Sequence, residues 1–231
     1  NIANADTPGF KSDKLLSRSF KDMMLDRVGD PSVMSRRYET GSLNTGVHID
    51  EAITDFSQGS VQETGRPTDV ALMDDGFFVV NTPKGERYTR DGNFSRNAEG
   101  YLVTSDGSRV VGENGSDIEI DIGTEFSIDQ YGSILGAEGD NLGKLRVVRF
   151  EDPAGLRKEG NNNYVNFTNG AMENVEDYQV QAGYLEASNA QMANEMIDMM
   201  QTYRAYETNQ RVVKMLDATL EKSVNVIGRI G

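Results

Sequence analysis

The last forty residues carry one regular apolar pattern. Positions spaced alternately four and three apart, from 192 to 224, hold apolar or aromatic side chains at eight of ten places. These eight are Met192, Met196, Met199, Tyr203, Tyr206, Val213, Leu220 and Val224. A stripe with a period of about 3.5 residues, sustained over several heptads, is typical of a coiled-coil seam. We therefore predict one helix over residues 188–227 with an assembly seam made for another helix.

The ends of this helix are also predicted by the sequence. Ser188 and Gln191 have the spacing of a capping box, and Gly228 is the flexible residue favoured after a helix end. Forty residues span about 60 Å, which exceeds the width of a small domain. An amphipathic helix packed on its own domain is the simpler alternative. Gln210 and Asp217 interrupt the stripe, and they either set its register or face solvent.

The pattern changes between residues 70 and 185, where short alternating strands are separated by turns. The segments predicted as strands are 69–80, 86–89, 101–104, 109–111, 118–122, 126–128, 133–135 and 145–150. Turn sequences such as Thr-Pro-Lys-Gly and Ser-Asp-Gly-Ser join consecutive strands into hairpins. We expect an antiparallel β domain over 70–185, so the fold class is mainly β with a long terminal α-helix.

Two further regions precede the β domain. Leu16, Phe20, Met23 and Met24 recur at helical spacing, which predicts a short helix over 12–28 within an N-terminal region of residues 1–29. Residues 30–69 are polar and favour an extended connector, in which the segment around Val61 adds an edge strand. The C-terminal coiled-coil region then covers residues 186–231.

Charge and composition remove several classes of function. The chain has 23 basic and 37 acidic residues, and its net charge of −14 disfavours binding to nucleic acid or to an anionic membrane. Residues 71–185 hold 10 basic and 20 acidic side chains, whereas residues 186–231 hold 5 and 6. No apolar run exceeds five residues, so we expect neither membrane insertion nor a signal peptide. Cysteine is absent.

The sequence offers little for catalysis. His48 is the only histidine, and no nucleophile elbow or phosphate-binding glycine motif accompanies it. A partial calcium-loop pattern begins at Asp91, but Arg96 and Leu102 occupy its two diagnostic positions. Asp74 and Asp75 are adjacent, and we interpret them as a solvated turn rather than a carboxylate pair. We therefore expect no enzyme activity, no metal and no cofactor.

The first eleven residues, NIANADTPGFK, closely resemble the N-terminal signature of bacterial flagellar rod and hook proteins. The signature positions are Asn1, Ile2, Ala3, Asn4, Thr7, Pro8, Gly9 and Phe10. The C-terminal stretch is similar to the terminal helix of that family, notably in Ser188-Asn189, Glu195-Met196 and Arg204-Ala205-Tyr206-Glu207. Further motifs match in the middle of the chain, namely 69–72, 76–80, 88–94 and 100–104.

This resemblance implies a structural subunit of the bacterial flagellum, located in the basal body, whose terminal helices form an inner tube with β domains outside. The modest length is similar to that of rod proteins, of the distal rod type, rather than hook protein. The implied partners are copies of the chain in a helical polymer, other rod and hook subunits, surrounding ring proteins and the type III export apparatus. The family places a helix before Asn1 that this chain lacks, so we expect a truncated helix pair and a partly uncovered seam.

Two other classes of function remain as alternatives. One is a secreted carbohydrate-binding β module on a coiled-coil stalk, although the chain has no Trp for an aromatic platform. The other is a secreted hydrolase that uses Asp74 and Asp75. Glycan binding by the β domain, or activity sensitive to alanine at the two aspartates, would favour these alternatives.

Overall fold

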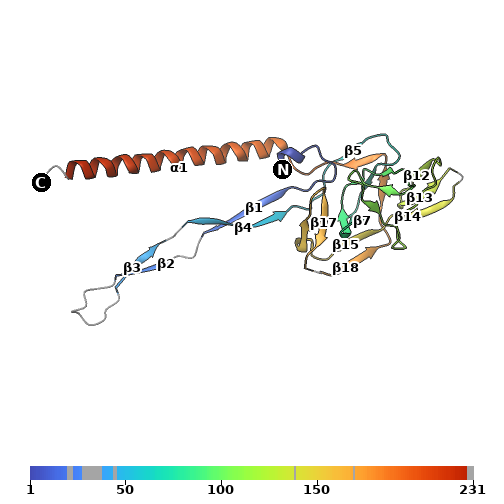
Figure 1. Ribbon diagram of the computed structural model, residues 1–231, viewed down its shortest axis with the longest axis horizontal. Coiled ribbons are helices and arrows are strands. Elements are labelled where there is room, and N and C mark those ends of the chain that lie inside the picture. Colours follow the sequence, from blue (N-terminus) through green and yellow to red (C-terminus); the bar gives the residue numbers. More distant parts are fainter. Residues whose placement is uncertain (20–22, 28–37, 44–45, 138, 169, 228–231) are drawn as a thin grey trace.

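A long helix and a β-ribbon arm project in the same direction from a β body (Figure 1). The computed structural model describes residues 1–19, 23–27, 38–43, 46–137, 139–168 and 170–227. The helix is α1 (Met192–Ile227), and a single 3₁₀ turn, η1 (Ile2–Asn4), lies at its base. Antiparallel β structure with one long C-terminal helix confirms the fold class expected from the sequence.

The body is built around a nine-stranded antiparallel sheet. Its strands are β7 (Phe77–Thr82), β8 (Gly85–Thr89), β9 (Ser95–Arg96), β10 (Leu102–Val103), β11 (Arg109–Val110), β15 (Val147–Phe150), β16 (Leu156–Lys158), β17 (Asn163–Asn166) and β18 (Met172–Val175). Strand β7 is central, because it pairs with β8 along one edge and with β11 and β15 along the other. The predicted hairpins at Thr-Pro-Lys-Gly and Ser-Asp-Gly-Ser are confirmed by the β7–β8 and β10–β11 pairs.

Both faces of β7 are buried, which explains why its sequence does not alternate. Phe78 and Val80 point into the larger hydrophobic cluster, whereas Phe77 and Val79 point into a second cluster on the other face. Aromatic side chains dominate the second cluster, where the Phe77 ring lies 5.6 Å from that of Tyr164. The body therefore has two small cores, one on each face of the sheet, and β7 contributes to both.

Smaller sheets complete the body. The predicted hairpin at residues 126–135 is confirmed as β12 (Phe126–Ile128) and β13 (Ser133–Gly136), extended by β14 (Asn141–Lys144). Two further pairs connect the early and late parts of the chain. They are β6 (Val70–Leu72) with β19 (Val180–Ala182), and β5 (Val61–Glu63) with β20 (Tyr184–Glu186). The edge strand expected around Val61 is thus present, and it lies beside the segment that leads into α1.

The helix predicted over residues 12–28 is wrong. The described parts of this segment are strands β1 (Asp13–Ser19) and β2 (Met23–Arg27), which pair with β4 (Val47–Thr54) and β3 (Tyr38–Leu43) to form the arm. The helical spacing of a few apolar residues was a weak signal, because a short helix in water gains most of its stability from packing an apolar face. Ile49 and Ile53 on the partner strand are β-branched and favour a ladder instead.

Two strand predictions also need correction. The segment 69–80 is not one strand, because a turn at Met73–Gly76 separates β6 from β7, and the Asp74 carboxylate accepts a hydrogen bond from Gln179 N at 2.8 Å. The segment 118–122 forms only isolated bridges rather than a strand. Ile118 and Ile120 are buried as expected, but Ile122 is 73% exposed beyond the end of this pairing.

The helix begins four residues later than predicted. Gln191 O accepts the first helical hydrogen bond, from Glu195 N, at 3.0 Å, so Gln191 occupies the N-cap position. The hydroxyl of Ser188 instead accepts from Ala190 N at 3.1 Å, and the expected capping box with Gln191 does not form. Residues 188–191 serve the junction described below, which explains why they are not helical. The helix continues to Ile227, the last described residue, and the predicted cap at Gly228 lies outside the described residues.

Candidate functional site: the junction at the base of the helix

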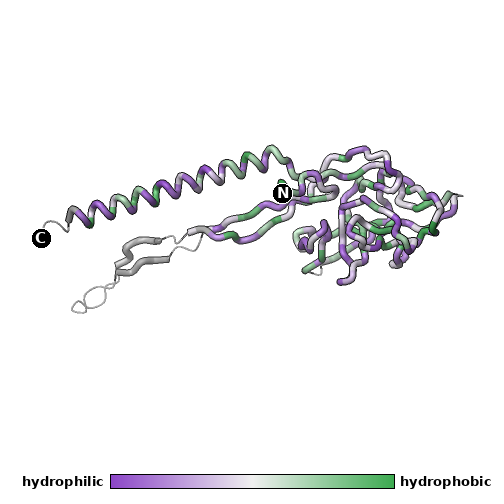
Figure 2. Tube along the Cα trace, turned by 45° about the horizontal axis from the view of Figure 1, so that its top comes forward, coloured by the Kyte–Doolittle hydropathy of each residue, from purple (hydrophilic) through white to green (hydrophobic). Residues whose placement is uncertain are grey.

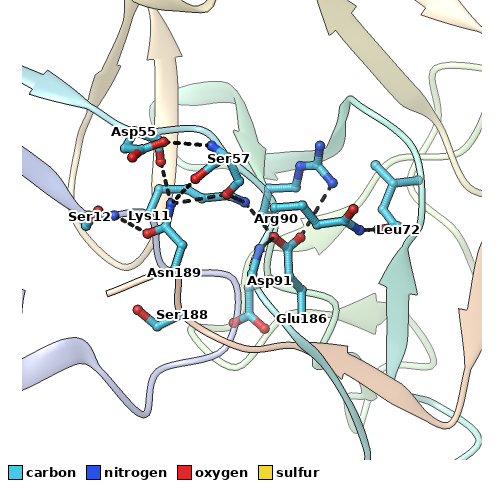
Figure 3. A network of polar contacts seen from close by, with 12 residues as sticks. Lys11, Ser12, Asp55, Ser57, Leu72, Arg90, Asp91, Glu186, Ser188 and Asn189 are labelled. Carbon is cyan, nitrogen blue, oxygen red and sulfur yellow. Dashed lines mark hydrogen bonds and ion pairs between the residues drawn. The ribbon is translucent and has the colours of Figure 1, made fainter. Parts of the chain in front are cut away.

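Four stretches that are far apart in the sequence converge where α1 meets the body (Figure 3). They are the N-terminal signature with Lys11 and Ser12, residues 55–59, the segment around Arg90, and residues 186–189 before the helix. We call this region the junction. Within the described chain, α1 has its main element contact with η1, so the helix joins the rest of the subunit at its base.

A buried ion cluster forms the centre of the junction. The Lys11 ammonium lies 2.5 Å from Glu186 Oε1, and both side chains are 1% exposed. Arg90 contributes a second cation, with one guanidinium nitrogen 3.5 Å from Glu186 Oε2. Removing the Glu186 carboxylate would leave two buried cations without a counter-charge, so the arrangement depends most strongly on Glu186.

Backbone groups satisfy the remaining polar atoms of Lys11 and Glu186. Lys11 Nζ donates to Ser57 O at 2.8 Å, and Glu186 Oε1 accepts from Gly59 N at 2.8 Å. Burial lowers the pKa of the Lys11 ammonium, and the adjacent Glu186 carboxylate opposes this change. Burial also lowers the pKa of Arg90. The cluster thus ties the connector segment at residues 57–59 to the signature and to the end of β20.

Asn189 forms a second set of contacts between the base of the helix and the signature. Its side chain accepts from Ser12 N at 2.7 Å and donates to Asp55 O at 2.7 Å, while its backbone N–H donates to Phe10 O at 3.3 Å. The last residues before α1 are therefore fixed to the N-terminal segment by both main-chain and side-chain bonds. The N-terminal signature and the segment that leads into the C-terminal helix meet at this point.

The signature residues take specific places at the junction. Gly9 has φ of +68°, and a Cβ there would lie 2.5 Å from Asp91 N, so this position requires glycine. Gly9 N donates to Glu186 O at 2.7 Å. Phe10 is buried, with the Lys158 ammonium 4.1 Å from its ring centre, and Pro8 O accepts from Asn162 Nδ2 at 2.9 Å. These contacts fix the signature against the β body.

The start of the signature contacts the helix directly. Asn1 Nδ2 donates to Glu195 Oε1 at 2.9 Å and to Asp13 O at 2.8 Å, so one side chain connects the first turn of α1 with the arm. Thr7 Oγ1 donates to Asn4 Oδ1 at 3.3 Å and closes the turn after η1. Ile2 and Ala3 lie within or beside this 3₁₀ turn. All eight predicted signature positions therefore lie at the base of the helix.

The predicted seam residues lie on the projecting helix, where this chain leaves them in solvent. Their exposed fractions run from 39% to 63%. The residues are Met192, Met196, Met199, Tyr203, Tyr206, Val213 and Leu220. Figure 2 shows apolar and polar residues intermixed along the whole helix, with no other segment of the body laid against it. Soluble monomeric proteins rarely expose contiguous large apolar side chains in this way.

Sequence reasoning did not find the ion cluster. Lys11, Arg90 and Glu186 are separated by up to 175 residues, and no periodicity or local motif joins them. Lys11 and Arg90 do fall inside segments that carry the family resemblance, which was the one available signal. The sole histidine, His48, pairs with Arg18 on the arm and lies 3.9 Å from Asp50, outside the junction.

The described residues also bear on metal binding and membrane insertion. Within the part of the chain that the structure describes, no group of three or more His, Cys, Asp or Glu side chains is placed to hold a metal ion. None of the described helices is both long and apolar enough to span a bilayer. Asp91, at the start of the partial calcium-loop pattern, instead accepts from Asn93 N at 3.0 Å within its own loop.

Comparison with known families and proteins agrees with this arrangement. Residues 71–136 match the family described as flagellar hook protein FlgE/F/G D1 domain, and residues 181–226 match the flagellar basal body rod FlgEFG protein C-terminal family. The flagellar basal-body rod protein FlgF of Caulobacter vibrioides is 36% identical over 231 residues, which is 100% of this chain and 89% of that protein.

Two proteins of Bacillus subtilis are also similar. The flagellar hook-basal body complex protein FlhO is 32% identical, covering 100% of this chain and 91% of that protein. The flagellar basal-body rod protein FlgG is 32% identical, covering 98% of this chain and 90% of that protein. The chain therefore belongs to the family of flagellar basal-body rod proteins, structural subunits of the flagellar basal body rather than enzymes.

Proposed function

We propose that α1 carries out the rod function by packing its seam against helices of neighbouring subunits, which together form a tube with the β bodies outside. The observation that carries this proposal is the 36-residue helix with its exposed Met- and Tyr-rich seam. Helices of this kind gain most of their stability from burying an apolar face. The acidic body, by contrast, suits a position in contact with solvent.

We further infer that the junction transmits torque between tube and body. Lys11, Arg90 and Glu186 form a buried cluster, and Asn189 fastens the base of the helix to the signature. Closely packed and buried ion pairs resist relative movement. A rod must transmit rotation with little loss, and a rigid connection between its inner and outer layers serves that purpose.

The partners proposed for this chain follow from the rod family. Assembly with other flagellar subunits is a property of the family, and we propose a helical polymer of this chain in the distal part of the rod. Other rod and hook subunits would bind at the ends of this polymer, and ring proteins would surround it. Export through the flagellar type III apparatus would deliver the unfolded chain.

The seam is tested by placing a charge on it. Met199→Asp and Tyr203→Asp should each abolish rod assembly and motility in the source bacterium, because a carboxylate would have to be buried without a partner. The β body should keep its fold, since both residues are exposed on the projecting helix. Electron microscopy of basal bodies measures assembly, and circular dichroism of the purified chain measures folding.

Gln201→Asp provides the matched control. Gln201 is exposed in the same helical turn but lies on the side away from the seam. This variant should assemble and support motility. Normal rods in the Met199→Asp and Tyr203→Asp strains would contradict the proposed role of the seam.

A further inference from the structure

Residues 208–219 of α1 carry a second uncharged face opposite the seam, and this face ends before Lys222, which holds the next f position. Numbering the seam as heptad positions a and d places Thr208, Val212, Met215 and Thr219 at successive f and c positions. We call these four residues the rear face. Positions c and f point away from the partner in a two-stranded coiled coil and are normally polar. Val212 and Met215 are nevertheless 43% and 62% exposed.

The threonines of the rear face make their polar bonds within the helix. Thr208 Oγ1 donates to Arg204 O at 2.9 Å, and Thr219 Oγ1 donates to Met215 O at 2.8 Å. Their hydroxyls therefore need no water or external partner, and the face they share with Val212 and Met215 is ready to be desolvated. The equivalent positions in the first half are Asn194, Asp198, Gln201 and Ala205, which are mostly polar.

The first half of α1 has a complementary surface. Met200 lies beside the seam residues Met192, Met196 and Met199, and it widens the apolar stripe there. Methionine side chains are flexible and polarisable, so they adapt to the shape of a neighbouring helix. We call these four residues the methionine stripe. Within the described chain it has no element packed along it beyond the contact of the helix base with η1.

Charge also distinguishes the two halves. Residues 192–207 hold three acidic and one basic side chain, whereas residues 208–227 hold three basic and two acidic ones. If two identical parallel helices were placed side by side without an offset, halves with the same sign of net charge would face each other. An offset that sets the second half of one helix beside the first half of another brings opposite net charges together.

We propose that the rear face of one subunit packs against the methionine stripe of a second copy of this chain, with the two parallel helices offset by about two heptads, or roughly 21 Å. The proposal deepens the proposed function and rests on it, because it assumes that α1 packs in the rod. Since the two surfaces differ, the contact is heterologous, and each subunit offers both. Such contacts propagate into open polymers rather than closing into dimers.

Disulfide cross-linking tests this contact, because the chain contains no cysteine of its own. A double variant, Met200→Cys with Met215→Cys, places one thiol on each surface of every subunit. The two positions are separated by about 22 Å within one helix, which exceeds the reach of a disulfide. Mild oxidation of assembled rods should therefore produce a ladder of covalent dimers, trimers and longer species.

Matched control variants test which face of the helix takes part in the contact and whether each subunit needs two thiols to form a ladder. Met200→Cys with Lys214→Cys keeps the axial level but turns the second thiol by about 100° around the helix, and it should give little ladder. Either single variant should give at most dimers. Intact rods that yield no ladder with the 200 and 215 pair would overturn this proposal and leave the seam-packed tube standing. Failure of the unaltered chain to form rods would overturn the proposed function itself.

A charge variant provides an independent test of the proposed contact if the double cysteine variant fails to assemble. Val212→Glu should abolish rod assembly, because the carboxylate would be buried against the methionine stripe. Gln201→Glu, at the equivalent side of the first half, should assemble normally. Rods of normal length in the Val212→Glu strain would contradict the proposed contact even if the cross-linking could not be carried out.

Discussion

At the residue scale, the Glu186 carboxylate forms ion pairs with two cations that come from different parts of the chain. Lys11 comes from the signature and Arg90 from the segment after β8, and both reach the same carboxylate. Arg90 also lies over the Phe77 ring, 5.5 Å from its centre, which connects the ion cluster to the hydrophobic core of the body. A single buried carboxylate thus specifies how the signature, the helix base and the body fit together.

Gly9 gives the most direct residue-scale prediction. Gly9→Ala should lower the free energy of unfolding by about 2–4 kcal/mol, because it adds strain at positive φ and a backbone clash with Asp91 N. Urea denaturation followed by circular dichroism measures this change.

Gly107→Ala is the control for strain without a clash. Gly107 also has positive φ, of +85°, but a Cβ there would meet nothing within 4 Å. It should lower stability by only about 1 kcal/mol. Equal effects of the two substitutions would show that Gly9 is constrained by its backbone angle alone and not by close packing at the junction.

At the scale of elements, the helix, the arm and the body differ in how far their apolar side chains are buried within the subunit. The body strands bury two hydrophobic clusters, whereas α1 and the β1–β4 ribbon expose large apolar side chains, including Leu15 and Ile49 of the arm. An isolated two-stranded ribbon is marginally stable in water. The projecting elements are therefore the parts of this subunit that stand to gain most from assembly.

Hydrogen exchange on the isolated chain tests this difference. The free energy of local opening should be about 1 kcal/mol for the amides of α1 between residues 208 and 219, because few contacts stabilise this part of the helix. Amides of β7, which is buried on both faces, should exchange only through global unfolding, at about 5–15 kcal/mol. Mass spectrometry of peptic fragments measures both. Similar protection in α1 and β7 would mean that the isolated helix has a partner surface.

Sequence patterns predicted the elements unevenly, for physical reasons. The long helix and the hairpins at residues 82–85, 105–108 and 129–132 were predictable, because heptad spacing and turn residues are local signals. The arm was not, because β1 is stabilised by pairing with β4 some thirty residues later and carries no clear alternation of its own. The ion cluster was not predictable for the same reason, since its members come from three distant segments that meet only in the folded chain.

At the scale of the whole molecule, a folded body is combined with an exposed helix and an exposed arm that we expect to contact neighbouring subunits. The helix and arm extend in one direction and the body lies at the other end (Figure 1), so copies stacked along a common axis would place like elements in the same layer. The junction lies between these layers. This arrangement agrees with a rod subunit whose inner layer is completed only by other subunits.

Thiol labelling before and after assembly tests most directly the claim that α1 is buried in the rod. Tyr203→Cys would place the only thiol of the chain on the seam, and Ile122→Cys would place it on an exposed part of the body. We predict that a maleimide reagent labels both variants as isolated subunits but labels only Ile122→Cys in assembled rods. Equal labelling of Tyr203→Cys in isolated subunits and in assembled rods would contradict the account.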